Sequence, residues 1–247
     1  MSHFRNVIFV AALAGLVAGL AMAALQAFAT TPLILKAETF EIAANGAPVT
    51  PDARTETSTG ASANTSVNTS VGESSGGFKR SALTIVANIV TAIGFGIIMV
   101  VLSEFAGGLS GWRPGLMWGL AGFASFTLAP GLGLPPELPA MPAGDLVARQ
   151  SWWLATVAAT AGGLALIALM SNGLYAILGV ALIIAPHLVG APQPVDHSSP
   201  VPADLHHQFV VMSTLSSLVF WALLGGLIGY FRPRFFEAPS GQNIGVA

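Results

Sequence analysis

Six apolar runs, separated by polar joints, constrain this chain more than any other feature of its sequence. A helix that crosses a bilayer needs about 20 mostly apolar residues, and most of these runs reach that length. Only 8% of the 247 residues are charged, against roughly 25% in soluble domains. We therefore expect an all-α integral membrane protein, a single polytopic domain over residues 1–247 with a bundle of about six transmembrane helices. The runs are Asn6–Leu35, Ser81–Ser103, Gly115–Leu134, Trp152–Met170, Leu174–Val189 and Phe209–Phe231.

The first run resembles a secretory signal in one respect, because Ala27-Phe28-Ala29 matches the small residues of a signal-peptidase site. A signal peptide has an apolar region of only about 7–15 residues, however. The run that follows Arg5 is far longer. We expect an uncleaved helix.

The first joint, residues 43–77, is rich in Ser, Thr, Asn and Gly and has almost no large apolar residue. Such a composition cannot bury a core, so we expect a disordered loop within the membrane domain. Asn64 and Asn68 begin formal glycosylation sequons. A stretch this rich in Asn, Ser and Thr produces such sequons by chance, so we draw no conclusion about glycosylation from them.

The fifth run is the shortest, and Ser171-Asn172-Gly173 predicts a tight turn before it. The turn favours a helical hairpin over Trp152–Val189. If this segment were instead one broken span, the joint that follows it would lie on the other face of the membrane. Both readings stay open at this point.

Six spans place the first, third and fifth joints on one face, whichever way the protein is inserted. Nine of the eleven acidic residues and four of the five histidines fall on that face. Carboxylate and imidazole groups bind divalent transition metals. Because the chain has no cysteine, it offers no thiolate for soft copper(I) or an iron–sulfur cluster. Co(II), Ni(II) or Zn(II) is the expected class of ion.

The candidate metal ligands lie at or near the helix ends on this face. His187 follows Pro186 at the end of an apolar helix, and an ionisable residue at that depth is a functional hypothesis by default; a plain interfacial histidine is the alternative. The helix dipole favours carboxylates in the first turn of a helix. A structural capping role therefore competes with metal binding for Asp145 and Asp204. Adjacent histidines point about 100° apart on a helix and form no pair alone. The candidates are His187, Glu137, Asp145, His206, His207 and Asp204.

Small and polar residues inside the runs predict helix packing rather than chemistry. Gln26 and Asn88 suit an interhelical hydrogen bond. Glycines four residues apart permit close helix contact. They form the pairs Gly15/Gly19, Gly115/Gly119 and Gly225/Gly229.

Several function classes are excluded or disfavoured. The formal charge of −2 argues against nucleic acid, which requires a basic face. The sequence has no phosphate-binding loop and no His-Glu-x-x-His motif. We expect no enzyme and no bound cofactor, and the lipid bilayer as the main surrounding. Arg5, Arg232 and Arg234 favour both termini inside, although Lys and Arg near the span ends are almost balanced.

Several segments resemble the CbtA family, predicted cobalt transporter subunits of bacteria. The Pro-Glu-Leu-Pro stretch and the Ala-Pro-His…Gly-Ala-Pro stretch are the most distinctive. The resemblance covers most of the chain except 43–77. It rests on TTPLILKAETFE, PPELPAMPAGDLVARQSWWLATVAATAGGLAL, GVALIIAPHLVGAPQP and VPADLHHQFVVMSTLSSLVFWALLGGLIGYF.

The resemblance implies uptake of Co²⁺ for cobalamin synthesis at the bacterial inner membrane. It also implies a small CbtB-like partner with one span and a histidine-bearing end. The family is commonly described with five spans, whereas the six runs here predict six. Two alternatives remain: a non-transporting membrane subunit that assembles a partner, and a membrane enzyme that uses His187 with an acid such as Glu137.

Overall fold

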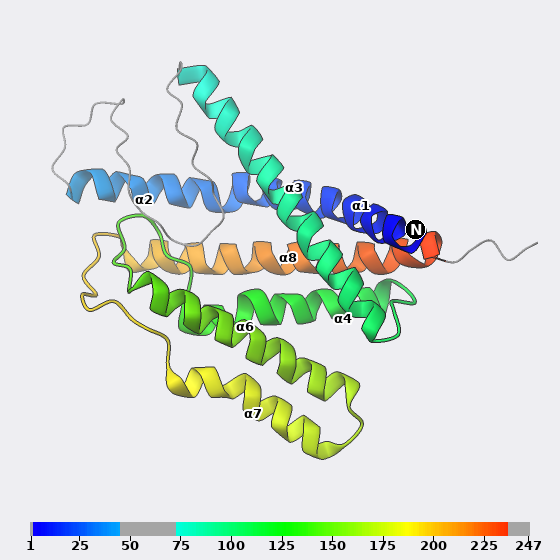
Figure 1. Cartoon of the computed structure of the whole chain (residues 1–247). Helices are drawn as coiled ribbons and strands as arrows, with labels where there is room; N and C mark the ends of the chain where they lie inside the picture. The colour runs from blue at the N-terminus through cyan, green and yellow to red at the C-terminus, as the bar shows by residue number, and fades with distance from the viewer. Residues whose placement is uncertain (1, 45–72, 237–247) are drawn as a thin grey trace, which may run out of the picture.

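The computed structural model describes residues 2–44 and 73–236, and these residues form helices joined by turns and two longer irregular segments (Figure 1). No strand occurs within these two ranges, which confirms the predicted all-α class. The elements are α1 (Ser2–Leu25), η1 (Gln26–Thr30), α2 (Thr31–Ala44), α3 (Glu73–Phe105), α4 (Trp112–Phe123), η2 (Ala124–Leu128), α5 (Ala129–Gly133), α6 (Leu146–Leu169), α7 (Gly173–Val189) and α8 (Ala203–Phe236).

Five helical stretches are long and apolar enough to cross a membrane, and each covers one of the predicted runs to within one residue. The remaining run forms α7, whose 17 residues reach about 25 Å at 1.5 Å per residue. That is less than the hydrocarbon thickness of about 30 Å. The long stretches are Phe4–Ala44, Ser81–Phe105, Trp112–Gly133, Leu146–Leu169 and Ala203–Phe235.

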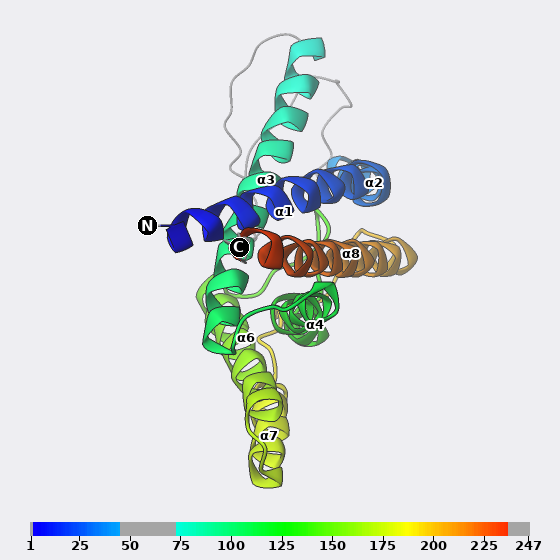
Figure 2. The same ribbon diagram turned by 90° about the vertical axis from the view of Figure 1, so that its right-hand side faces the viewer.

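Helices α6 and α7 form an antiparallel hairpin at the edge of the bundle (Figures 1 and 2). Asn172 caps the start of α7, because its side chain accepts a hydrogen bond from the backbone N–H of Leu174 at 3.0 Å. The chain therefore reverses between these two helices, as the turn residues predict. The reading of Trp152–Val189 as one broken span is wrong.

The first helix is longer than its apolar run, since α1, η1 and α2 continue through Lys36, Glu38 and Glu41 to Ala44. The π-helical turn η1 ends two residues before Pro32, and η2 ends two residues before Pro130. Proline lacks an N–H and clashes with the carbonyl four residues earlier. One wider turn relieves that clash without ending the helix.

The helices extend into both ends of the range 43–77 that the sequence predicts as a disordered loop. Residues 43–44 complete α2, and residues 73–77 begin α3. Residues 45–72, with most of the predicted loop, lie outside the described residues.

Glycines bring α4 and α8 into direct backbone contact, as their spacing predicts. A Cβ atom at Gly115 would collide with the backbone of Gly225 and Gly229, and one at Gly119 with the backbone of Trp221 and Gly225. Gly15 and Gly19 of α1 lie equally close to α3. Close approach of this kind supplies van der Waals contact where no hydrophobic effect operates between helices.

A central core and a smaller second core hold the helices together. Aromatic rings fill part of the central core: Phe126 stacks on Trp221 at 5.5 Å, and both contact Phe95. The second core lies where α2 passes the start of α8, and it includes the segment 134–145. Its buried residues are Ala37, Leu138, Val201, Leu205 and Phe209.

Candidate functional site

The segments 134–145 and 190–202 meet α2 and the start of α8 at one end of the bundle, which we call the loop end. The second core joins α2, the first of these segments and α8 there. The side chain of Gln193 donates a hydrogen bond to the carbonyl of Gly133 at 3.2 Å, which joins the second segment to the end of α5, directly before the first segment. The structure therefore confirms that the third and fifth joints share one end, beside α2; residues 45–72 of the first joint lie outside the described residues.

His187 lies in the last turn of α7 and is half-buried. Its ring meets the ring of Trp152 edge-on, with centroids 5.8 Å apart and planes at 72°. Trp152 is buried, and its indole N–H donates to the backbone carbonyl of Pro186 at 3.1 Å. The second turn of α6 thus fixes the turn of α7 that carries His187.

Glu137 forms an ion pair with Arg149, with 2.9 Å between its Oε2 and the Nη2 of the arginine. The two side chains are 27% and 18% exposed, so the pair is largely shielded from water. A guanidinium at this distance neutralises the carboxylate. A cation that binds Glu137 must therefore displace Arg149 or share the carboxylate with it.

The two predicted aspartates begin helices. Asp145 caps α6, because its Oδ1 accepts a hydrogen bond from the backbone N–H of Ala148 at 2.8 Å. Asp204 lies exposed in the first turn of α8, behind Pro202. For Asp145, the structure supports the capping role that competes with metal binding.

His206 and His207 separate as their adjacent positions predict. His206 is half-buried, and its Nε2 lies 3.2 Å from the carbonyl of Pro136. Since a carbonyl only accepts, Nε2 carries the proton, and a neutral ring then keeps a lone pair on Nδ1. His207 is exposed.

Asp196 adds a further negative charge to the loop end. The backbone N–H of Ser198 and then its hydroxyl donate to this carboxylate, both at 2.8 Å, and these bonds hold the pKa of Asp196 below its usual value. Asp196 and neighbouring His197 are both exposed. Asp196 therefore stays ionised at neutral pH.

The candidate residues gather at the loop end without forming one ligand cage. Among residues 2–44 and 73–236, no group of three or more His, Asp or Glu side chains could hold a metal ion together. Glu137 is engaged with Arg149 and Asp145 with a helix terminus. Of the three predicted histidines, His187 and His206 are half-buried at the loop end, whereas His207 is exposed.

Sequence reasoning missed two residues that shape this site. Trp152, which the sequence marks only as the start of an apolar run, supports the turn that carries His187. Arg149 neutralises Glu137. The signal for Arg149 was present, because opposite charges in a short joint that contains few others suggest an ion pair.

Comparison with known proteins identifies one relationship. A family model described as "Probable cobalt transporter subunit (CbtA)" matches residues 4–232, nearly the whole chain. No curated protein and no solved structure shows a significant match.

Proposed function

The chain belongs to the CbtA family of probable cobalt transporter subunits, and from this membership we propose that it is the membrane subunit of a cobalt uptake system. It is a multi-pass membrane protein, with five helices long and apolar enough to cross a bilayer. In this role it moves an ion and performs no chemistry on a substrate, so it needs no resident cofactor.

The observation that carries the proposal is the convergence of imidazole and carboxylate groups at the loop end. His187, His206 and Glu137 come from three separate segments that the fold brings to one end of the bundle. Such groups suit Co²⁺ and other borderline divalent ions, and the chain has no thiolate to favour copper(I). In this proposal Co²⁺ first meets the loop end and then passes His187.

Additional donors come from a second subunit in this proposal. The described residues offer no three-donor group, while a metal held by two side chains keeps most of its water. A small CbtB-like subunit, with one span and a histidine-bearing end, would supply further imidazoles at the loop end. Uptake would then serve cobalamin synthesis.

The second candidate is a non-transporting subunit that assembles or stabilises its partner in the membrane. One observation favours it: two predicted ligands, Glu137 and Asp145, already have structural partners. A protein that only holds a partner in place needs no ligand cage of its own.

Uptake of radiolabelled cobalt separates the two candidates. Cells lacking other cobalt importers should be compared when they express the chain alone, the one-span partner alone, or both. A transporting subunit gives uptake above that of the partner alone. If the partner transports at the full rate whenever it is stabilised by other means, such as fusion to an unrelated membrane helix, the chain is an assembly subunit.

We further propose that the protein lies in the bacterial inner membrane with both termini in the cytoplasm. Arg5, Arg232 and Arg234 lie where α1 begins and α8 ends. Cytoplasmic ends of spans carry an excess of Lys and Arg. The loop end then faces the periplasm, where an imported ion arrives.

A further inference from the structure

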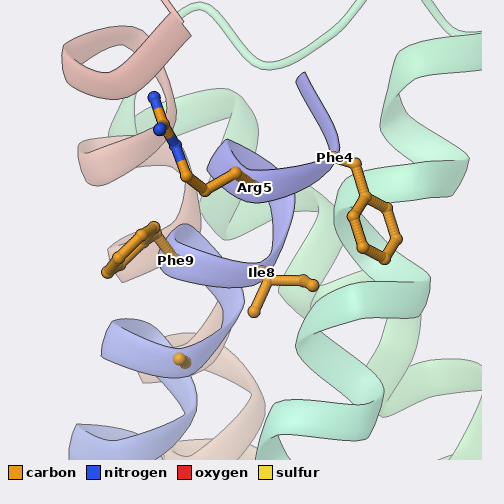
Figure 3. Close-up of a pocket in the computed structure, with 5 residues that line it drawn as sticks. Phe4, Arg5, Ile8 and Phe9 are labelled. Atoms are coloured by element: carbon orange, nitrogen blue, oxygen red, sulfur yellow. The ribbon is translucent and has the colours of Figure 1, made fainter. Parts of the chain in front are cut away.

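The first turns of α1 carry a groove at the end of the bundle opposite the loop end, which we call the terminal end. The groove has a volume of about 340 Å³ and is lined by Phe4, Arg5, Ile8, Phe9 and Ala12. Figure 3 shows Phe4 extending toward α3, while Arg5 and Phe9 extend on the side of α8. Its walls are almost entirely apolar, and Arg5 supplies the one charged group among its lining residues.

The groove follows the helix axis from the membrane surface inwards. Phe4, Ile8 and Ala12 are four residues apart, so they form one row on α1. The eight helical steps from Phe4 to Ala12 span about 12 Å, close to the hydrocarbon depth of one leaflet, about 15 Å. Phe4 and Ile8 are 72% and 41% exposed, and Ala12 is half-buried, so the row is open to an acyl chain.

The charge at the mouth of the groove has no partner among the described residues, 2–44 and 73–236. Arg5 is exposed, and no hydrogen bond or ion pair joins it to another residue within 2–44 and 73–236. At the same end, Arg234 lies 3.6 Å over the ring of Tyr230, whereas Glu104 is held by Arg232 at 2.7 Å. The carboxylate of Glu104 is therefore engaged by Arg232, and no acidic side chain of the described residues is paired with Arg5.

We propose that this groove binds an anionic phospholipid, with the phosphate at the Arg5 guanidinium and one acyl chain along Phe4, Ile8 and Ala12. The depth fits, because Arg5 immediately precedes the first apolar run and so lies at the level of the lipid phosphates. The Asn6 side chain donates to the carbonyl of Phe235 at 2.6 Å, which fixes the end of α8 beside the site. This inference does not depend on the transported ion.

Native mass spectrometry of the full chain in detergent tests the proposal. The protein is titrated with phosphatidylglycerol or with phosphatidylcholine of the same acyl chains. One arginine near a membrane surface contributes enough to give a preference of roughly five-fold for the anionic lipid. Arg5→Gln should reduce the preference to near one, whereas Arg5→Lys should keep most of it.

Arg113→Gln is the matched control, because Arg113 is an exposed arginine of the same end that lies over Trp112 and outside the groove. It should leave the preference unchanged. Ala12→Leu fills the groove, keeps Arg5, and should weaken binding of both lipids; it decides the question if the Arg5→Gln protein does not fold by circular dichroism. The proposal is overturned if the wild type shows no preference, if Arg113→Gln lowers it as much as Arg5→Gln, or if Ala12→Leu binds lipid like the wild type.

Discussion

The indole N–H of Trp152 donates to the backbone carbonyl of Pro186, 3.1 Å away, and the ring of Trp152 also meets the ring of His187 edge-on. The same carbonyl accepts the backbone N–H of Gly190 at 3.1 Å, where α7 ends. One side chain of α6 therefore holds the last turn of a helix that packs at the edge of the bundle. His187 owes its position to this contact.

Replacing Trp152 by Phe should loosen the α6–α7 hairpin. The change removes the N–H but keeps an aromatic ring, and an interhelical hydrogen bond in a membrane protein contributes about 0.6 kcal/mol on average. We expect the thermal midpoint in detergent to fall by a few degrees, with cobalt binding weakened more than by the control. Trp112→Phe is that control, because Trp112 is 54% exposed and begins α4, outside the α6–α7 hairpin. Equal midpoints and equal cobalt binding for the two variants would contradict a positioning role for Trp152.

Gly225 and Gly226 offer a matched pair for testing the contact between α4 and α8. A Cβ at Gly225 would collide with the backbone of Gly115 and Gly119, whereas one at Gly226 meets nothing within 4 Å. Gly225→Ala should therefore destabilise the protein by about 1–3 kcal/mol, the usual cost of overpacking. Gly226→Ala should be neutral or slightly stabilising, because alanine is the better helix former. Unfolding in denaturant from mixed micelles measures both, and similar curves would show that the helices do not pack through these glycines.

Sequence periodicity predicted these glycine contacts because interhelical packing in a membrane leaves a local pattern. Polar residues inside the runs predicted interhelical hydrogen bonding for Gln26 and for Asn88, and the structure shows that Asn88 donates to Gln26 at 2.6 Å. The continuation of the first helix into α2 was not predicted, since the charges at Lys36, Glu38 and Glu41 resembled a joint. That extension packs Ala37 into the second core at the loop end, and such a contact between distant segments leaves no local signal.

The candidate site was predictable in its location but not in its detail. Counting spans placed the histidines and carboxylates on one face, because the parity of helices fixes where joints lie. The ion pair between Glu137 and Arg149 forms because the segment 134–145 folds back on α6. The spacing of apolar residues along a helix carries no information about the path of such a segment.

Both termini should lie in the cytoplasm. A reporter that functions only in the cytoplasm, fused after Ala247, should be active, and one that functions only in the periplasm should be inactive at the same site. The physical reason is the group of arginines where α1 begins and α8 ends. The opposite reporter pattern would invert the orientation or change the number of spans.

Cobalt binding should weaken on acidification, because a protonated imidazole has no lone pair for the metal. The loss should fall below about pH 6.5, where histidines ordinarily gain a proton. Binding of Co²⁺ to purified protein in detergent is the better measurement, since pH also alters the energy available for uptake. Asp196, whose pKa is lowered by Ser198, stays charged through this range, so Asp196→Asn should leave the shape of the pH curve unchanged. A curve that is flat from pH 7.5 to 5 would argue against imidazole ligands.

The most direct test of the account is cobalt uptake by the His187→Ala variant, with its one-span partner present and protein amounts matched by immunoblot. His3→Ala is the control, because His3 lies near the start of α1, at the opposite end of the bundle. The account predicts that His187→Ala lowers the initial rate of radiolabelled cobalt uptake at least ten-fold, as expected for loss of a metal ligand or its close support, while His3→Ala transports like the wild type. A His187→Ala protein that inserts normally and takes up cobalt at the wild-type rate would contradict the account.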